Sequence, residues 1–229
     1  MIVVLPCAGG CALSYKNYEN YLPNVYVYEY SGHWSRYDEP LDSSVQIMTY
    51  HLLQNIITRK GDEKLCLFGH SMGGFIAWLA AKELMKCGVE VSGLFIAACN
   101  APDSKMDFIE TIENDADIKK FLKKIRQVPE NILNSEFFSE NLLPAIRNDI
   151  ELVRKIPMQT NLKSECLRVP ITCFCAVNDS IVKTSDMNGW ERFTSREFSL
   201  KKYKGNHFFV YDKKNVELIS NEIKFCMGI

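Results

Sequence analysis

The pattern Gly-His-Ser-Met-Gly at residues 69–73 constrains the fold of this 229-residue chain more than any other feature. It follows the apolar run Lys64–Phe68 and opens a helical pattern over Met72–Cys87. A serine between a strand and a helix in this spacing sits on a sharp, strained turn, with its hydroxyl above the end of the strand. Side chains two positions before and after it would collide, so both positions need glycine or another small residue. The pattern indicates a nucleophile elbow at Ser71, with the backbone N–H of Met72 available to an oxyanion.

Two other interpretations of this turn are weaker. An ordinary glycine-rich strand-to-helix turn remains an alternative. A phosphate-binding loop is disfavoured because no lysine follows in the required pattern.

Short apolar runs alternate with longer helical patterns along most of the chain. Continuously apolar runs are typical of strands that are buried on both faces. Strands that alternate with helices favour a mostly parallel sheet covered by helices on both faces, which is an α/β fold. The predicted strands are Ile2–Leu5, Val25–Tyr30, Lys64–Phe68, Gly93–Ala98, Ile171–Val177 and Phe198–Tyr203, and the predicted helices are Ser14–Tyr21, Ser43–Arg59, Met72–Cys87 and His207–Cys226.

One segment, about residues 103–165, interrupts this alternation. It contains no convincing strand pattern, and its short helical patterns are broken at Pro129, Pro144 and Pro157. Apolar residues between Ile118 and Ile125 recur at helical spacing. We therefore expect one domain, residues 1–229, with a helical insertion over about 103–165.

A nucleophilic serine needs a base, and hydrolases with this elbow place serine, acid and histidine in that chain order. His207 is the only histidine after Ser71, and it follows a predicted strand. It is therefore the predicted base. The acid that orients it is expected at the end of a strand between the two. Asp179 is the first choice for this acid and Asp103 is the alternative.

The other three histidines have no motif that gives them a catalytic role. His70 is adjacent to Ser71, but a side chain next to the elbow serine points away from the site. We expect His70, His33 and His51 to be structural.

A second oxyanion donor is expected from the loop after the first predicted strand. Residues 5–10 of that loop read Leu-Pro-Cys-Ala-Gly-Gly, and the two glycines let the backbone approach a substrate closely. The N–H of Ala8 is the predicted donor, with that of Cys7 as the next choice. A simple tight turn is the alternative interpretation.

Composition limits the remaining classes of function. Lysine and arginine total 27 against 28 aspartates and glutamates, so nothing favours nucleic-acid binding. Nine cysteines, without a CxxC pair, lie mostly in apolar runs, which favours free thiols, a cytoplasmic protein and no zinc site. Residues 1–10 do not have the pattern of a signal peptide, and no apolar run is long enough to span a membrane.

Taken together, these motifs resemble the type II thioesterases of nonribosomal peptide and polyketide synthases. That family has the α/β-hydrolase fold and an aromatic-Pro-His-Ala-Gly-Gly loop, which corresponds to residues 5–10 here. Its Pro-Gly-x-x-x-Arg-x-x-Glu-Pro stretch corresponds to residues 31–40, and its elbow to residues 69–73. Further matches are the lid pattern over residues 142–149, Val-Pro-Ile at 169–171, Asn178-Asp179, and Gly-Asn-His-Phe-Phe at 205–209.

The resemblance implies a serine thioesterase with Ser71, Asp179 and His207 as the triad and the amides of Ala8 and Met72 as the oxyanion hole. It implies hydrolysis of stalled acyl groups from the phosphopantetheine arm of carrier proteins. It also implies a lid formed by the helical insertion, no metal or bound cofactor, and a monomer. The chain departs from the family pattern at Cys7 and Ser31, which could alter the substrate entrance, and Met1 lies close to the first strand, which leaves open whether an N-terminal strand is missing.

Two questions stay open at this level. The basic residues of the insertion, Lys119, Lys120, Lys123, Lys124 and Arg126, could dock an acidic carrier protein or form an ordinary solvated helix face. The same triad would also serve a general serine esterase, a lipase or an acyltransferase, and a non-catalytic binding protein on this fold is a further alternative.

Overall fold

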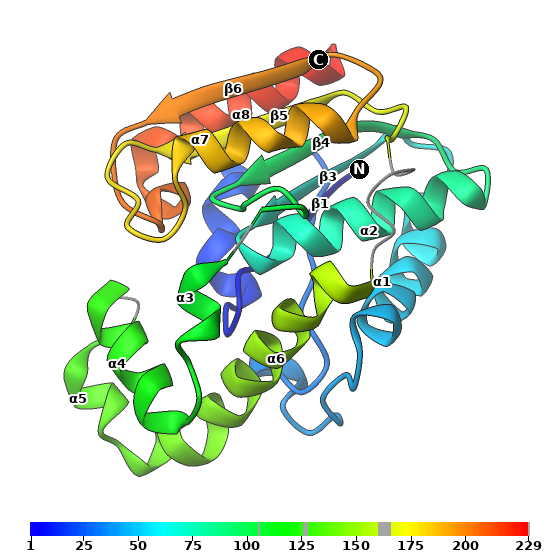
Figure 1. Ribbon diagram of the computed structural model, residues 1–229. Helices are drawn as coiled ribbons and strands as arrows, with labels where there is room; N and C mark the ends of the chain where they lie inside the picture. The colour runs from blue at the N-terminus through cyan, green and yellow to red at the C-terminus, as the bar shows by residue number, and fades with distance from the viewer. Residues whose placement is uncertain (105, 126–127, 160–165, 229) are drawn as a thin grey trace.

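The computed structural model describes residues 1–104, 106–125, 128–159 and 166–228. At its centre lies one sheet with the strand order β2-β1-β3-β4-β5-β6, in which all neighbouring described strands are parallel (Figure 1). The predicted α/β fold is confirmed. The strands are β1 (Ile2–Leu5), β2 (Val25–Val27), β3 (Leu65–His70), β4 (Val91–Ala97), β5 (Ile171–Ala176) and β6 (Phe198–Tyr203).

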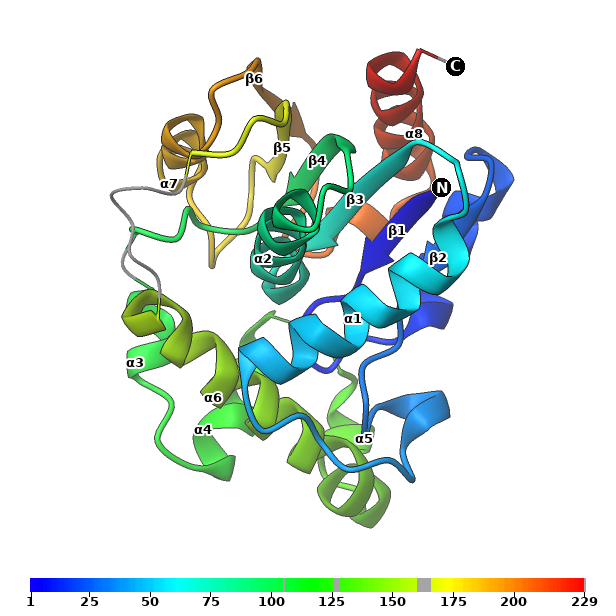
Figure 2. The same ribbon diagram turned by 90° about the vertical axis from the view of Figure 1, so that its right-hand side faces the viewer.

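Helices cover both faces of the sheet (Figure 2). Helices α1 (Val45–Lys60) and α2 (Met72–Lys86) pack on one face, and the 3-10 helix η1 (Ala12–Asn20) and helix α8 (Lys213–Met227) pack on the other. Alternate residues of a strand point to opposite faces. Val3 and Leu5 of β1 accordingly join the core beside α1 and α2, whereas Ile2 and Val4 join the core beside α8.

Two predicted elements near the N-terminus differ from the structure in length or in type. The strand predicted over Val25–Tyr30 ends at Val27. Beyond this end, the Arg36 guanidinium donates a hydrogen bond to the Glu29 carbonyl oxygen at 2.7 Å. The helix predicted over Ser14–Tyr21 is a 3-10 helix.

The prediction of a continuous helix over His207–Cys226 is wrong at its start. His207 lies in a loop that continues into the short 3-10 helix η6 (Phe209–Tyr211), and α8 begins only at Lys213. Asp212 sets this boundary, because its carboxylate accepts the backbone N–H groups of Lys214 and Asn215 at 3.0 and 3.2 Å. His207 therefore lies outside any helix, in the loop that follows β6.

Helices of the insertion gather beyond the carboxyl ends of the strands (Figure 1). Residues 160–165 of the predicted insertion lie outside the described residues. No helix in the described part of the chain is long and apolar enough to cross a membrane. The insertion comprises α3 (Asp107–Glu110), α4 (Asp115–Ile125), α5 (Glu130–Leu133), the π-helix η3 (Phe138–Leu142) and α6 (Leu143–Gln159), while α7 (Thr184–Met187), η5 (Asn188–Phe193) and the 3-10 turn η2 (Trp34–Arg36) complete the fold.

Candidate active site

Ser71 lies on a strained turn between β3 and α2. Its backbone has φ 54° and ψ −121°, a region that a non-glycine residue rarely adopts. A Cβ added to Gly69 would lie 2.1 Å from the Gly73 carbonyl oxygen, and one added to Gly73 would lie 2.1 Å from the Leu5 carbonyl oxygen. The two glycines therefore let β1, β3 and the start of α2 approach closely enough to form the elbow.

Asp179 and His207 come together from the loops after β5 and β6. The Nδ1 atom of His207 lies 2.9 Å from Asp179 Oδ2, so Nδ1–H donates and Nε2 is left to accept a proton. The second carboxylate oxygen accepts the N–H groups of Ile181 and Val182 at 2.8 and 3.1 Å. Burial by itself raises the pKa of Asp179, but the hydrogen bonds from His207 and from these amides bring that pKa below its ordinary value.

The alternative acid, Asp103, lies elsewhere. Its carboxylate pairs with the guanidinium of Arg192, with Nε at 3.0 Å and Nη2 at 2.5 Å from Oδ2. The geometry therefore joins His207 to Asp179 and not to Asp103.

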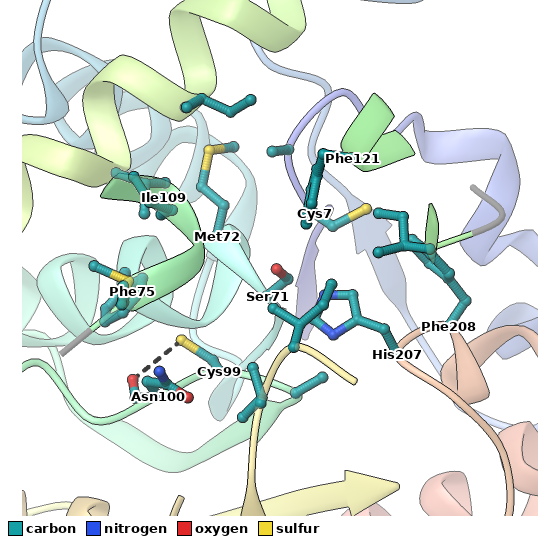
Figure 3. Close-up of a pocket in the computed structure, with 18 residues that line it drawn as sticks. Cys7, Ser71, Met72, Phe75, Cys99, Asn100, Ile109, Phe121, His207 and Phe208 are labelled. Atoms are coloured by element: carbon teal, nitrogen blue, oxygen red, sulfur yellow. Dashed lines mark hydrogen bonds between the residues drawn. The ribbon is translucent and has the colours of Figure 1, made fainter. Parts of the chain in front are cut away.

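Ser71 and His207 line one pocket beneath the insertion, and Figure 3 shows the serine side chain beside the imidazole. The walls are mostly apolar and come from the sheet edge, α2, the insertion and the loop after β5. Such walls suit an acyl chain better than a polar substrate. The lining side chains from the insertion are Met106, Ile109, Phe121, Ile125, Ile150 and Val153.

The loop after β1 contributes Cys7 and Ala8 to the same pocket. The N–H of Cys7 donates to the Tyr15 hydroxyl at 3.1 Å, within the core. The Cys7 carbonyl accepts the N–H of Gly10 at 2.8 Å, which closes a tight turn. Of the two candidate donors in this loop, the Cys7 amide is therefore directed into the core, and Ala8 remains the candidate second oxyanion donor.

His70 connects three parts of the site through a buried network. It faces the His207 carbonyl oxygen with Nε2 and the Tyr15 hydroxyl with Nδ1, both at 2.9 Å. Because a carbonyl oxygen only accepts, Nε2–H donates and Nδ1 accepts from Tyr15. Burial, with a smaller contribution from His207, lowers the pKa of His70 to about 3, so the ring is neutral. His70 thus connects η1, the elbow and the loop of the candidate base.

The other two histidines each face a carboxylate. His51 Nδ1 lies 2.8 Å from Asp42 Oδ1, and His33 Nε2 lies 2.9 Å from Asp149 Oδ2 on α6. Sequence reasoning missed the second pair, whose members are 116 positions apart. The available signal was that both residues lie in stretches that match the family pattern, His33 within residues 31–40 and Asp149 at the end of residues 142–149, but neither stretch indicates that the two side chains meet.

The two departures from the family pattern differ in their position. The Cys7 thiol lies at the pocket, and burial raises its pKa to about 11, so it stays protonated. Ser31 is buried and accepts a hydrogen bond from Arg36 Nη2 at 3.0 Å, and it is not among the described residues that line the pocket. Only the change at Cys7 therefore reaches the candidate site.

The basic residues of the insertion fall into two groups. Lys119 donates to Ser139 at 3.2 Å, and Lys123 pairs with Glu130, so both contact other parts of the insertion. Lys120 and Lys124 are exposed and line a groove that shares Phe121, Ile125 and Ile181 with the Ser71 pocket. Arg126 lies outside the described residues.

A nucleophile elbow at the end of β3, in a parallel sheet beneath a helical insertion, defines an α/β-hydrolase. Residues 1–226 match the family model described as the thioesterase domain, and the chain belongs to this thioesterase family.

Similarity to named relatives supports this assignment. The chain is 28% identical to "Thioesterase PikA5" of Streptomyces venezuelae, over 93% of this chain and 76% of the relative. It is also 28% identical to "Gramicidin S biosynthesis protein GrsT" of Aneurinibacillus migulanus, over 98% and 89% of the two chains. Among solved structures, ClbQ from the colibactin pathway superposes with a TM-score of 0.86 at 24% identity, over 99% of this chain and 96% of that chain, which shows the shared fold.

Proposed function

We propose that this thioesterase removes stalled acyl groups from the phosphopantetheine arms of carrier proteins in nonribosomal peptide or polyketide synthesis. The observation that carries the proposal is the serine elbow beside the Asp179–His207 pair in an apolar pocket. The chain's membership of the thioesterase family and its likeness to relatives from such pathways support it.

In the proposed mechanism, Ser71 Oγ attacks the thioester carbonyl carbon while His207 Nε2 takes the hydroxyl proton. The amides of Ala8 and Met72 stabilise the resulting oxyanion, and the Asp179 carboxylate stabilises the imidazolium. The carbon–sulfur bond then breaks, and the leaving thiolate takes the proton from His207. This leaves the acyl group on Ser71.

Deacylation repeats these steps with water in place of the serine hydroxyl. His207 takes a proton from water, the hydroxide attacks the acyl-serine carbonyl, and the proton passes to Ser71 Oγ as the acid departs. The proposed route uses no metal or bound cofactor, since the phosphopantetheine is part of the substrate.

The position of Lys120 and Lys124 at this groove supports the proposal that the partner is acidic. Both ammonium groups belong to α4, and the groove adjoins the Ser71 pocket through shared side chains. Carrier proteins are usually acidic, so these lysines would meet the carrier while the arm enters the pocket.

The proposal is tested by mass spectrometry of an acyl-phosphopantetheinyl carrier protein incubated with the enzyme, beside a free small-molecule ester at matched concentration. We expect faster loss of the carrier-bound acyl group, abolished by Ser71→Ala. Ester hydrolysis that leaves the carrier thioester untouched would instead identify a general esterase. A folded enzyme that neither hydrolyses these substrates nor reacts with a fluorophosphonate probe would be a non-catalytic binding protein.

Carrier docking has its own test. Lys120→Glu and Lys124→Glu should each lower kcat/KM for the carrier-bound thioester several-fold and leave kcat/KM for a free acyl-pantetheine within about twofold, because only the first substrate presents an acidic protein surface. Lys202→Glu makes the same charge change at an exposed residue of the edge strand β6 that is not among the residues lining the groove, and it serves as the control. Equal losses on both substrates would exclude docking at this face.

A further inference from the structure

A buried ion pair connects the insertion to the body of the protein. Asp149 on α6 and His33 are enclosed, with side chains 0% and 1% exposed. His33 Nε2 faces Asp149 Oδ2 at 2.9 Å, and His33 Nδ1 faces the Ser31 carbonyl oxygen at 3.0 Å. Both ring nitrogens therefore face acceptors, so both carry protons and the ring is an imidazolium. Burial acts to lower the pKa of His33, but the Asp149 carboxylate outweighs it and raises that pKa to about 9.

The same carboxylate oxygen also holds the turn after β1. Asp149 Oδ2 accepts the Gly9 N–H at 2.8 Å. On the other side of Gly9, the indole N–H of Trp34 donates to the Gly9 carbonyl at 3.2 Å. Ile146, one turn before Asp149 on α6, covers the glycine so closely that an added Cβ would lie 2.4 Å from its Cγ1. Two side chains of one helix in the insertion therefore fix the position of Gly9.

Gly9 determines the geometry of the turn that carries Ala8. Its φ of +64° is the left-handed value that a type II turn needs at its third residue. The Cys7 carbonyl points inward to the Gly10 N–H at 2.8 Å. Because a trans peptide directs its N–H opposite to its C=O, the Ala8 N–H points out of the turn. Ala8 lies at the pocket that contains Ser71.

The charge of the pair also bears on the oxyanion. An isolated Asp149 carboxylate beside this turn would oppose the negative charge that develops on the substrate oxygen. The His33 imidazolium offsets that charge. The pair can therefore anchor the turn without placing a net negative charge near the oxyanion.

We propose that Asp149, with His33 as its counter-ion, is a positioning residue that couples the helical insertion to the oxyanion-binding turn. The inference rests on the proposed function, because it takes the Ala8 N–H as an oxyanion donor. In this arrangement α6 has two roles, since it forms one wall of the acyl pocket and it holds the turn in the geometry that the transition state requires.

Asp149→Ala and Asp149→Asn test the proposal. Alanine removes the acceptor of the Gly9 N–H, whereas asparagine keeps an acceptor oxygen in place and loses the charge. The control is Asn148→Ala, at the residue of α6 that directly precedes Asp149. Its Nδ2 donates to the Asp42 carbonyl at 3.1 Å, so the variant loosens the same helix without touching the turn.

The readouts are kcat and KM on an acyl-pantetheine, and the affinities of a trifluoromethyl ketone and a matched methyl ketone. The first ketone forms a tetrahedral oxyanion on a reactive serine, and the second reports on pocket binding. We expect Asp149→Ala to lower kcat about 10- to 100-fold and to leave KM within about threefold of the wild-type value. We expect it to weaken the binding of the trifluoromethyl ketone by a similar factor and to leave the binding of the methyl ketone unchanged. Asp149→Asn should recover most of this loss, and Asn148→Ala should match the wild type.

Equal weakening of both ketones, or an unchanged kcat in a folded Asp149→Ala variant, would overturn the inference. If Asp149→Ala does not fold, the neutral pair Asp149→Asn with His33→Gln replaces it. We expect this double variant to bind the trifluoromethyl ketone more tightly than His33→Gln alone, which leaves an unpaired carboxylate, and the reverse order would overturn the inference. The ketone comparison does not depend on the leaving group, so a wild type that hydrolyses esters but no thioesters would refute the proposed function and leave this inference standing.

Discussion

Replacing Gly73 with alanine tests how the elbow is built. The new Cβ would lie 2.1 Å from the Leu5 carbonyl oxygen and 2.6 Å from that of Pro6, and both neighbours are backbone atoms. The end of β1 and the start of α2 must therefore separate by roughly 1 Å, since no side chain can rotate away. Overpacking of this kind costs about 1–3 kcal/mol, and we expect the upper end because only backbone can yield. For a chain of this size, about 3 kcal/mol corresponds to a Tm lower by roughly 6–12 °C.

We also expect kcat/KM to fall strongly, because the displaced carbonyls of Leu5 and Pro6 directly precede the turn that contains Ala8. A misplacement of roughly 1 Å at a reacting centre can cost about 100-fold in rate. Gly88→Ala is the matched control, since Gly88 has φ +75° and open space around it, so alanine there adds backbone strain of about 1–2 kcal/mol without a clash. Thermal unfolding and kcat/KM on an acyl-pantetheine measure both effects. A Gly73→Ala enzyme as active and stable as the wild type would refute this account of the elbow.

The remaining predictions concern buried groups around the site. Burial acts to lower the pKa of His33, but the Asp149 carboxylate and, more weakly, the Ser31 carbonyl and Glu29 raise that pKa from 6.5 to about 9. The resulting stability of the folded state is fully present below about pH 6.5 and is lost as pH rises through 9, by an amount of the order of 3 kcal/mol. Urea unfolding from pH 6 to 9.5 should show this loss in the wild type and not in His33→Gln, and parallel curves would contradict it. Asn215→Leu should lower the free energy of unfolding by about 1–3 kcal/mol and should also lower kcat. The Asn215 side-chain amide donates at 2.9 and 3.0 Å to two backbone carbonyls of the loop that carries the proposed base, His207. An unchanged Tm would argue against this role. Tyr15→Phe should lower the free energy of unfolding in urea by about 1–3 kcal/mol, because it removes the hydroxyl that donates to His70 Nδ1 and accepts the Cys7 N–H. An unchanged free energy of unfolding would show that these hydrogen bonds add nothing to stability.

Local sequence patterns predicted most of the elements because the signals are themselves local. The continuous apolar runs correspond to the strands of the parallel sheet, and Ser44 and Asp212 cap α1 and α8 with their own side chains. The predicted helix over His207–Cys226 shows the limit. Its apolar spacing continues through the break, and only the Asp212 cap moves the start of the helix to Lys213.

The candidate site also combines parts that the local sequence predicts with parts that depend on tertiary contacts. The elbow could be identified from five residues, and His207 by elimination, because no other histidine follows Ser71. The choice between Asp179 and Asp103 depends on which loop faces His207. In the structure His207 Nδ1 lies 2.9 Å from Asp179 Oδ2, whereas Asp103 pairs with Arg192, and neither contact could be predicted from the sequence.

Sequence alone therefore determined the alternation of strands and helices, the strained turn at Ser71 and the chemistry that a serine, an acid and a histidine can perform. Those properties follow from residue types at short spacing, where the backbone itself limits the distances. Only the tertiary structure decided that Asp149 reaches both His33 and Gly9, because this contact depends on how α6 packs across the end of the sheet. Contacts between segments more than a hundred residues apart are determined by the packing of the whole chain. The sequence around either partner therefore does not predict which residues meet.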